Sequence, residues 1–320
     1  MRILITGAAG MIGRKLLARL AAEGALAGRR IAAIDLHDIV APTAPDSVAF
    51  VVATHQGDLA DPSVARALVA AKPDVIFHLA GIVSGEAEAN FDLGYRVNLD
   101  GARVLFDAVR AAQISPRIVF TSSIAVFGAP FPAVIPDDFH LTPLTSYGTQ
   151  KAMAEALLAD YTRKGIFDGV GIRLPTICVR PGKPNKAASS FFSGIIREPL
   201  SGLPADLPVS REVVHTHASP RSAVGFLLHA AAIDGALVGP RRNLTMPGVG
   251  VTVGEQIEAL REIAGDKAVA LIREAPDAIV AKIVAGWPTR FDARRARELG
   301  FVAERTFEEI IRAYIADDRG

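Results

Sequence analysis

Tyr147 and Lys151 have the residue types and the spacing of an acid–base pair. Residues four positions apart share one face of a helix, so the lysine ammonium can lie near the phenol oxygen. A tyrosine that acts as a base needs such a neighbour, because its reference pKa is about 10 and an adjacent cation typically lowers it by about 1 to 3 units. The pair therefore predicts removal of a proton from a hydroxyl group.

Three glycines near the N-terminus have the spacing of a phosphate-binding turn. Gly7, Gly10 and Gly13 follow the short apolar run of residues 3–5, which is typical of a strand buried on both faces. A tight turn of this kind brings the backbone N–H groups at the start of a helix against an anion. We expect a pyrophosphate to bind there.

An acidic residue, Asp35, lies 22 positions after Gly13, and we expect it to end a second strand over residues 30–35. A carboxylate at that point accepts both ribose hydroxyls of an adenosine and repels a 2′-phosphate. This interpretation predicts NAD rather than NADP. The alternative is a solvated acid that begins a loop together with Asp38.

Strand-like runs at 31–34, 75–79, 117–121 and 169–174 alternate with helix-period segments. This alternation predicts an α/β fold, a doubly wound parallel sheet of the Rossmann type, with a smaller C-terminal substrate-binding region. We expect residues 1–175, with 210–235 returning, to form the nucleotide-binding domain. Residues 176–209 and 236–320 are then the substrate-binding region.

The glycine spacing and three later segments resemble the extended short-chain dehydrogenases/reductases, the NAD-dependent epimerase/dehydratase family. The segments are 57–59 (Gly-Asp-Leu), 78–81 (His-Leu-Ala-Gly) and 97–98 (Val-Asn). The resemblance implies sites at the adenine, the phosphates and a kinked helix. The cofactor-binding residues that we expect are Gly7, Gly10, Met11, Ile12, Gly13, Asp35, Asp58, Leu59, Leu79, Ala80, Gly81, Asn98, Tyr147, Lys151 and Pro175.

The same resemblance assigns the catalytic roles. It implies that Tyr147 takes the hydroxyl proton while a hydride leaves the same carbon for the nicotinamide. Ser123 would hold the substrate oxygen, and Lys151 would lower the pKa of Tyr147 and bind the nicotinamide ribose.

A basic loop after residue 179 is the expected substrate clamp. Arg180, Lys183 and Asn185 can bind a carboxylate, since an arginine fork gives bidentate geometry. The alternative is a solvated basic turn. The loop and the segment after it are similar to a branch of the family that oxidises the C2 hydroxyl of a four-carbon sugar acid. The candidate substrate residues are Ser84, Ser123, Tyr147, Thr176, Arg180, Lys183, Asn185 and Arg211.

Two departures distinguish the chain from nucleotide-sugar members of the family. Thr176 stands where those members usually carry an asparagine that holds the diphosphate, and residues 217–220 lack their usual paired acids. Three functions remain open: a sugar-acid dehydrogenase, a nucleoside-diphosphate-sugar epimerase or dehydratase, and a catalytically silent NAD-binding scaffold. Net NADH formation separates the first two, and the complete set of Ser123, Tyr147 and Lys151 argues against the third.

The amino-acid composition limits which kinds of partner the protein is expected to bind. The 320-residue chain has a formal charge of +1 and no long basic run, which argues against nucleic-acid or membrane-surface binding. One cysteine, Cys178, and the lack of an 18-residue apolar stretch lead us to expect a cytoplasmic location. The histidines lack metal-ligand spacing, so we expect no metal. Helices over 90–112 and 147–162 carry apolar residues on more than one face, which predicts a homodimer.

Overall fold

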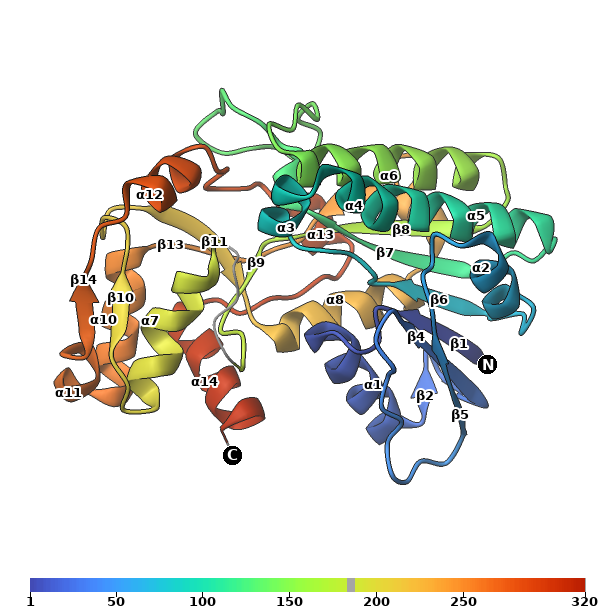
Figure 1. Cartoon of the computed structure of the whole chain (residues 1–320), viewed down its shortest axis with the longest axis horizontal. Helices are drawn as coiled ribbons and strands as arrows, with labels where there is room; N and C mark the ends of the chain where they lie inside the picture. Colours follow the sequence, from blue (N-terminus) through green and yellow to red (C-terminus); the bar gives the residue numbers. More distant parts are fainter. Residues whose placement is uncertain (183–187, 320) are drawn as a thin grey trace.

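Within the described residues, a seven-stranded parallel sheet forms the centre of the larger domain (Figure 1). The structure is a computed structural model and describes residues 1–182 and 188–319. Across the sheet, the strands follow the order β12 (Asn243–Thr245), β8 (Asp168–Leu174), β7 (Arg117–Ser123), β6 (Val75–His78), β1 (Arg2–Thr6), β4 (Ala33–Asp38) and β5 (Val51–Gln56).

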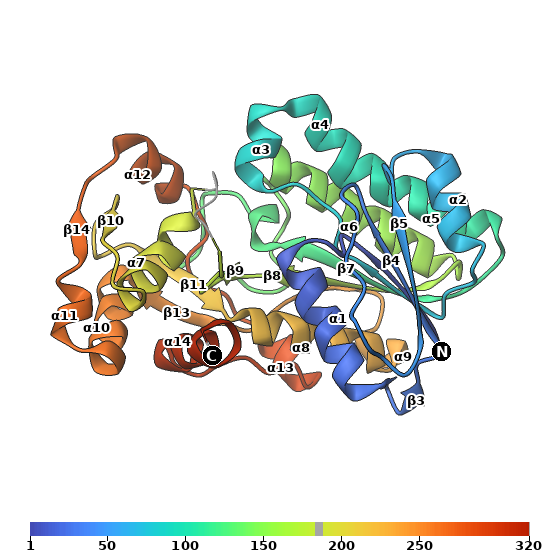
Figure 2. The same ribbon diagram turned by 60° about the horizontal axis from the view of Figure 1, so that its bottom comes forward.

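Helices cover both faces of this sheet, as Figures 1 and 2 show. α1 (Met11–Glu23) and α8 (Pro220–Ala232) pack on one face. α2 (Pro62–Val69), α5 (Gly101–Ala111) and α6 (Ser146–Arg163) pack on the other. The predicted doubly wound Rossmann architecture is therefore confirmed.

Local signals explain where the first helices begin and end. α1 ends at Gly24, which has the left-handed conformation that glycine adopts without strain. α2 begins with Pro62 after Asp61, whose side chain accepts a hydrogen bond from the N–H of Ser63. Both boundaries agree with the sequence pattern.

The helix expected over residues 90–112 is interrupted. α4 (Phe91–Tyr95) leads into η1 (Arg96–Asp100), a π-helical turn, and α5 follows. The extra residue in such a turn redirects the side chains. Asn98 lies in this turn, which agrees with the kinked helix that the family resemblance implies.

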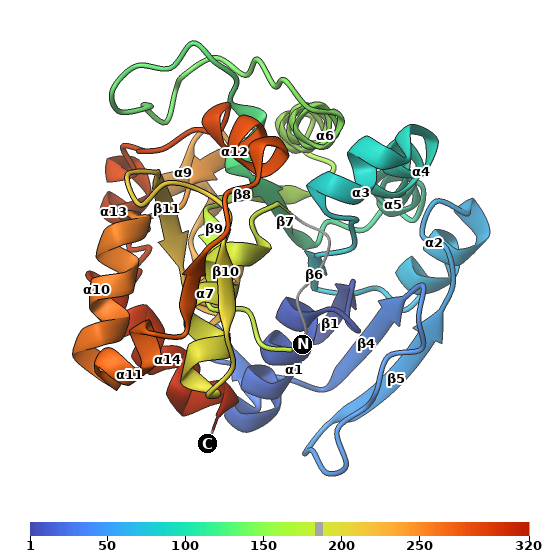
Figure 3. The ribbon, with the colours of Figure 1, turned by 60° about the vertical axis from the view of Figure 1, so that its left-hand side comes forward.

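The smaller domain has its own hydrophobic core. In Figure 3, β10 and β14 run side by side at its front, with α12 above them. Its elements are β9 (Thr176–Ile177), α7 (Ser190–Leu200), β10 (Ala205–Leu207), β11 (Val214–Ala218), β13 (Val249–Thr252), α10 (Val253–Ala264), α11 (Asp266–Val269), β14 (Ile272–Glu274), α12 (Ala278–Ala285) and α14 (Phe307–Asp318). Short elements elsewhere are β2 (Ala25–Leu26), β3 (Arg29–Arg30), α3 (Ser84–Ala89), η2 (Ile124–Val126), α9 (Gly235–Val238) and α13 (Arg294–Glu298).

Two of the expected domain boundaries are wrong. β11, expected to return to the main sheet, pairs with β9 and β13 in a separate sheet. α8, from the same segment, does pack on the main sheet. β12, placed by sequence in the substrate-binding region, pairs with β8 at the edge of the main sheet. The chain therefore crosses between the domains more often than the sequence pattern indicates.

The apolar residues expected to form a dimer interface on α5 are buried within the chain. Val104, Leu105, Ala108 and Val109 lie in the core under α2 and α6. This part of the dimer argument is wrong, because the chain's own helices cover that face. Met153 on α6 does remain 42% exposed.

A buried ion pair joins α6 to two strands of the sheet. Glu155 on α6 accepts hydrogen bonds from the guanidinium of Arg173 on β8, with the closest contact at 2.8 Å. The hydroxyl of Ser122 on β7 donates to the same carboxylate at 2.6 Å. The side chains of Glu155 and Arg173 are only 1% and 7% exposed, so removing one partner leaves the other as a buried charge.

We expect Arg173→Leu to lower the free energy of unfolding by about 3 to 5 kcal/mol, because Glu155 would stay buried without its partner. Urea denaturation at pH 7 measures this loss. Arg163→Leu is the control, since its pair with Asp160 is exposed and is worth less than about 1 kcal/mol. Similar losses in the two variants would contradict the importance that we assign to burial.

Candidate active site

A cavity of about 550 Å³ opens at the carboxyl ends of the central strands, between the two domains. The glycine turn after β1, the ends of β6 and β7 and the start of α6 form one side. β9, the start of α7 and the segment 286–288 form the other. Ligands of doubly wound folds bind at this edge of the sheet. The predicted residues that line the cavity are Gly7, Gly10, Met11, Ile12, Gly13, Leu79, Gly81, Ser84, Ser123, Tyr147, Lys151, Pro175, Thr176 and Arg180.

The glycine turn requires residues without a side chain at two positions. A Cβ atom on Gly7, where φ is +75°, would lie 2.6 Å from the backbone nitrogen of Ala80. A Cβ atom on Gly13 would lie 2.4 Å from the carbonyl oxygen of Gly7. The turn therefore packs directly on the strand-end segment and presents the first N–H groups of α1 to the cavity, where they have no partner within the helix. These groups would hold the pyrophosphate of a dinucleotide.

The prediction that the second strand ends at Asp35 is wrong. β4 continues to Asp38, and Asp35 is 4% exposed in the middle of the strand. Its carboxylate is paired with Arg2 at 2.8 Å and with His55 at 3.0 Å, so both oxygens are used within the protein. Asp38 occupies the carboxyl end of the strand instead. Its Oδ2 accepts the N–H of Ala9 in the glycine turn at 3.0 Å.

Four other predicted cofactor residues are not among those that line the cavity. Asp58 pairs with Arg96 at 2.7 Å, and Leu59 is buried in the core of that face. Ala80 contacts the glycine turn through its backbone. Asn98 accepts the N–H of Ile82 and donates to the side chain of Gln150, and both bonds hold the segment after β6 in place.

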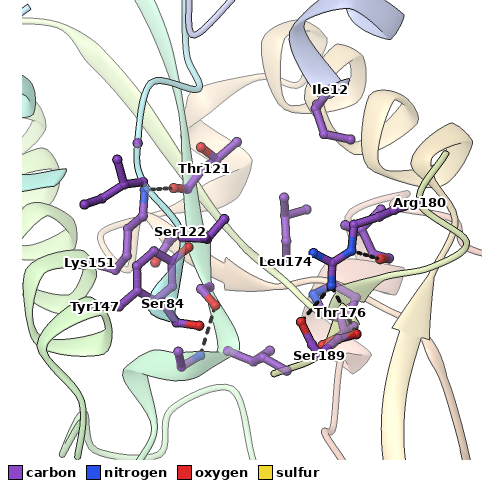
Figure 4. Close-up of a pocket in the computed structure, with 18 of the residues that line it drawn as sticks. Ile12, Ser84, Thr121, Ser122, Tyr147, Lys151, Leu174, Thr176, Arg180 and Ser189 are labelled. Carbon is purple, nitrogen blue, oxygen red and sulfur yellow. Dashed lines mark hydrogen bonds between the residues drawn. The ribbon is translucent and has the colours of Figure 1, made fainter. Parts of the chain in front are cut away.

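Ser123, Tyr147 and Lys151 line the same side of the cavity, where Figure 4 shows Tyr147 and Lys151 side by side. Ser123 ends β7, and α6 begins just before Tyr147 with the hydroxyl of Thr145 as its cap. The Nζ of Lys151 donates to the carbonyl of Thr121 at 2.9 Å and lies 5.8 Å from the centre of the Tyr147 ring. The predicted helix-face relation between Tyr147 and Lys151 is present.

Burial shifts both titratable groups of this set. It lowers the pKa of Lys151 to about 8, and the charge of Glu155 acts in the opposite direction. Burial raises the pKa of Tyr147, and a hydrogen bond with Ser123 offsets part of that rise. The expected net lowering of the Tyr147 pKa is therefore not found, because burial outweighs the hydrogen bond with Ser123.

A cation faces this set from the other side of the cavity (Figure 4). Arg180 follows β9, and its guanidinium donates to the hydroxyl of Ser189 at 2.7 Å and to the carbonyl of Ile177 at 3.1 Å. Among the described residues, no carboxylate pairs with it. A partly buried guanidinium with hydroxyl and carbonyl neighbours can donate hydrogen bonds to the carboxylate of a ligand.

Three other residues were predicted to bind the substrate: Arg211, Lys183 and Asn185. Arg211 lies outside the cavity, next to a separate hollow under α12, and pairs with Glu274 at 3.0 Å. The structure therefore does not bring Arg211 to this cavity, since its guanidinium pairs with Glu274 on β14. Lys183 and Asn185 fall outside the described residues.

The sequence analysis did not identify several residues on the side of the cavity that contains Arg180, which we call the far wall. His215, Arg197, Ser193 and Trp287 line the cavity beside Arg180. His215 is buried in β11, and it also lines the cavity. The two alternating histidines of β11 were a signal in the sequence, although their pattern could not show which neighbours they meet.

His78 fits the expected core role. Its Nδ1 shares a hydrogen bond with the hydroxyl of Thr6, its ring stacks on Phe120, and burial lowers its pKa to about 3. Among the described residues, no group of three or more His, Cys, Asp or Glu side chains is arranged to hold a metal ion. In the same part of the chain, every helix is too short or too polar to cross a membrane.

Similarity to known proteins covers almost the whole chain. Proteins named D-erythronate dehydrogenase from Cupriavidus necator and Haemophilus influenzae are 47% and 39% identical. The alignments cover 99% of this chain in both cases, and 98% and 100% of those proteins. A solved structure from Agrobacterium tumefaciens, described as a nucleoside-diphosphate-sugar epimerase, is 61% identical and has a TM-score of 0.98 over 100% of this chain and 95% of that one.

The family follows from the sequence match and the geometry together. The pattern of the NAD dependent epimerase/dehydratase family matches residues 3–217, which include the glycine turn, Ser123, Tyr147 and Lys151. These residues meet at one cavity between the two domains. The chain therefore belongs to the NAD-dependent epimerase/dehydratase family.

Proposed function

We propose that this protein is an NAD-dependent dehydrogenase that oxidises the C2 hydroxyl of a small sugar acid, D-erythronate, to 2-dehydro-D-erythronate. One observation carries the proposal: Ser123, Tyr147 and Lys151 lie across one cavity from Arg180, an arginine that pairs with no carboxylate among the described residues. A 2-hydroxy acid needs both groups, since its reacting hydroxyl and its carboxylate are on adjacent carbons. The two relatives named D-erythronate dehydrogenase support the choice of acid.

The chemistry assigns one task to each residue. The glycine turn would hold NAD, which would supply an acceptor for the hydride from C2. Tyr147 takes the proton of the C2 hydroxyl, Ser123 orients that oxygen, and Lys151 supplies a positive charge next to the phenol. Arg180 holds the carboxylate, which fixes C2 relative to Tyr147.

The direct test is NADH formation with D-erythronate, followed by its absorbance. We expect steady accumulation with the wild type, and a kcat about 10²- to 10⁴-fold lower for Tyr147→Phe, because the ring stays but the proton acceptor is lost. NAD affinity of the variant should stay near that of the wild type. A wild type that forms no NADH with any C4 to C6 aldonic acid would sink the proposal.

The alternative function is a nucleoside-diphosphate-sugar epimerase, which the description of the Agrobacterium structure favours. Two observations argue against it. Thr176 replaces the expected asparagine, and Arg211, at the position where nucleotide-sugar members hold the diphosphate, pairs with Glu274 away from the cavity. An epimerase returns the hydride, so sugar interconversion without net NADH would support this alternative.

Arg180 and Arg211 provide a matched pair for testing the carboxylate clamp. We expect Arg180→Met to raise KM for the acid about 10- to 150-fold, which corresponds to about 1.5 to 3 kcal/mol for a charge-assisted hydrogen bond. Arg211→Met should leave KM unchanged, because Arg211 lies outside the cavity. Oxidation of the uncharged polyol erythritol should be equally slow in all three proteins. A KM that rises in Arg211→Met and stays unchanged in Arg180→Met would refute the assignment of Arg180 as the carboxylate clamp.

We propose further that the cofactor is NAD rather than NADP, with Asp38 in the role first given to Asp35. The carboxylate of Asp38 ends β4 beside the glycine turn. A 2′-phosphate placed against it would lose hydrogen bonds to the ribose and gain like-charge repulsion.

We expect Asp38→Asn to reduce the preference for NAD by at least about tenfold in kcat/KM, because the repulsion of the 2′-phosphate is removed. Asp35→Asn should leave the preference unchanged and lower stability, since Asp35 pairs with Arg2 and His55. Steady-state kinetics with both cofactors measure the ratio. A changed ratio in Asp35→Asn alone would restore the first assignment.

A homodimer through the outer face of α4 and α6 is our proposal for the assembly. Phe91 on α4 and Met153 on α6 are 59% and 42% exposed. Two such faces can pair across a two-fold axis. Sedimentation at micromolar concentration should give twice the chain mass of 33.8 kDa, and a monomer mass would exclude the interface.

A further inference from the structure

One helix of the smaller domain holds the clamp arginine, Arg180, through three residues. Ser189 immediately precedes α7, and Ser193 and Arg197 follow it at intervals of four residues, so all three lie on one side of that helix. Each of them makes a hydrogen bond with Arg180, and all four residues line the cavity. Figure 4 shows Arg180 beside Ser189. The place of the Arg180 guanidinium therefore depends on α7.

Arg180 itself lies in an irregular stretch of backbone. β9 ends at Ile177, and the next described helix, α7, begins at Ser190. Backbone groups in such a stretch still need partners, and here side chains supply them. The N–H of Arg180 donates to the hydroxyl oxygen of Ser193 at 3.0 Å, and its carbonyl accepts from Nη1 of Arg197 at 2.7 Å. The direction of both bonds is certain, because a backbone N–H and a guanidinium can only donate.

Arg197 differs from Arg180 in how its charge is used. Its Nη2 donates to Glu198 at 2.5 Å, and the side chains of this pair are 8% and 17% exposed. Both terminal nitrogens of Arg197 are therefore bonded within the protein, one to a carbonyl and one to a carboxylate. Arg180 has hydroxyl and carbonyl partners instead. The charge of Arg180 is thus available to an acid, whereas Glu198 already offsets the charge of Arg197.

The helix that carries these contacts is fixed in the core of the smaller domain. Phe192, Ile195 and Ile196 on α7 are fully buried and belong to the same hydrophobic cluster as residues of α10 and α14. Closely packed side chains of this kind have little freedom to move. Through Arg197, the irregular stretch at Arg180 is therefore tied to a rigid part of the domain.

We propose that Arg197 is a positioning residue for the carboxylate clamp. It holds the carbonyl of Arg180 and thereby fixes where the Arg180 guanidinium meets the acid, while Ser193 holds the N–H of the same residue. The proposal rests on the proposed sugar-acid dehydrogenase function, in which Arg180 binds the carboxylate. Arg197 acts through Arg180 and does not itself bind the acid, since its charge is paired with Glu198.

Arg197→Met removes the bond to the Arg180 carbonyl. We expect KM for D-erythronate to rise about 3- to 30-fold, because a displaced guanidinium binds the acid less well. The kcat, the KM for NAD and the slow oxidation of erythritol should stay near the wild-type values, since none of them depends on the clamp. Weaker NAD binding together with an unchanged KM for the acid would overturn the proposal.

A milder variant tests the other contact to the same backbone. Ser193→Ala removes the acceptor of the Arg180 N–H, and we expect KM for the acid to rise about 2- to 10-fold, the value of one neutral hydrogen bond. This variant keeps the ion pair of Arg197 with Glu198, so it should fold as the wild type does. An unchanged KM in Ser193→Ala would contradict control of Arg180 by α7.

A double-mutant cycle separates positioning from direct contact with the substrate. If Arg197 acts through Arg180, then Arg180→Met alone and Arg180→Met combined with Arg197→Met should have the same KM for the acid. If the two increases in KM multiply instead, Arg197 binds the substrate independently of Arg180 and the proposal fails.

Arg242→Met is the matched control for loss of a buried arginine. The guanidinium of Arg242 also donates to a backbone carbonyl, that of Gly169 at 2.7 Å, and also pairs with one carboxylate, that of Asp168. Arg242 immediately precedes β12 and is not among the residues that line the cavity. We expect lower thermal stability and an unchanged KM for the acid. A rise in KM equal to that of Arg197→Met would show that the effect is not specific to the far wall.

The positioning is also tested without substrate or cofactor. ¹⁵N relaxation of the Arg180 amide should give an order parameter of about 0.85 in the wild type, the value of a rigid backbone, and a lower one in Arg197→Met but not in Arg242→Met. An unchanged order parameter in Arg197→Met would refute the role of Arg197. This measurement separates the two proposals: if no aldonic acid yields NADH, the proposed function fails, while the relaxation data still decide whether Arg197 holds Arg180.

Discussion

The carboxylate of Glu155 is the interaction on which the geometry of the site depends. It lies one helical turn after Lys151 on α6 and binds Arg173 on β8 and Ser122 on β7. Ser122 precedes Ser123, and β8 leads directly to Pro175 and Thr176. A buried carboxylate is costly unless its oxygens are fully bonded, so the helix and both strands are held in one arrangement. The same charge also favours the ammonium form of Lys151.

Burial then determines the electrostatics of the cavity. Lys151 has a pKa of about 8 because the helix and the sheet exclude water from it, and Tyr147 has a raised pKa for the same reason. The site therefore places a phenol with a raised pKa beside an ammonium group with a lowered pKa.

The far wall of the cavity, which contains Arg180, differs from the Tyr147 side in its charges and hydrogen bonds. Arg180 extends from the connection after β9, and its neighbours are hydroxyl and carbonyl groups in place of acids. Thr176 and His215 next to it are neutral and linked to each other. The wall that contains Arg180 therefore combines a partly buried cation with neutral polar side chains.

The sequence by itself determined the elements whose causes are local. The glycine turn, the capped start of α2 and the four-residue spacing of Tyr147 and Lys151 depend on residues close together in the chain, and the structure retains all three. Periodicity also predicted the doubly wound sheet, since strands buried on both faces are apolar throughout. The edge strand β5 was harder to see, because half of its residues face solvent.

Only the tertiary structure decided which distant residues share the site. Asp35 and Asp38 look equivalent in the sequence, but strand register buries the first against Arg2 and leaves the second at the glycine turn. Arg180 and Arg211 look equally suited to a carboxylate, but only Arg180 lies at the cavity. The hydrogen bond between Thr176 and His215 joins residues 39 positions apart, so no local pattern could reveal it.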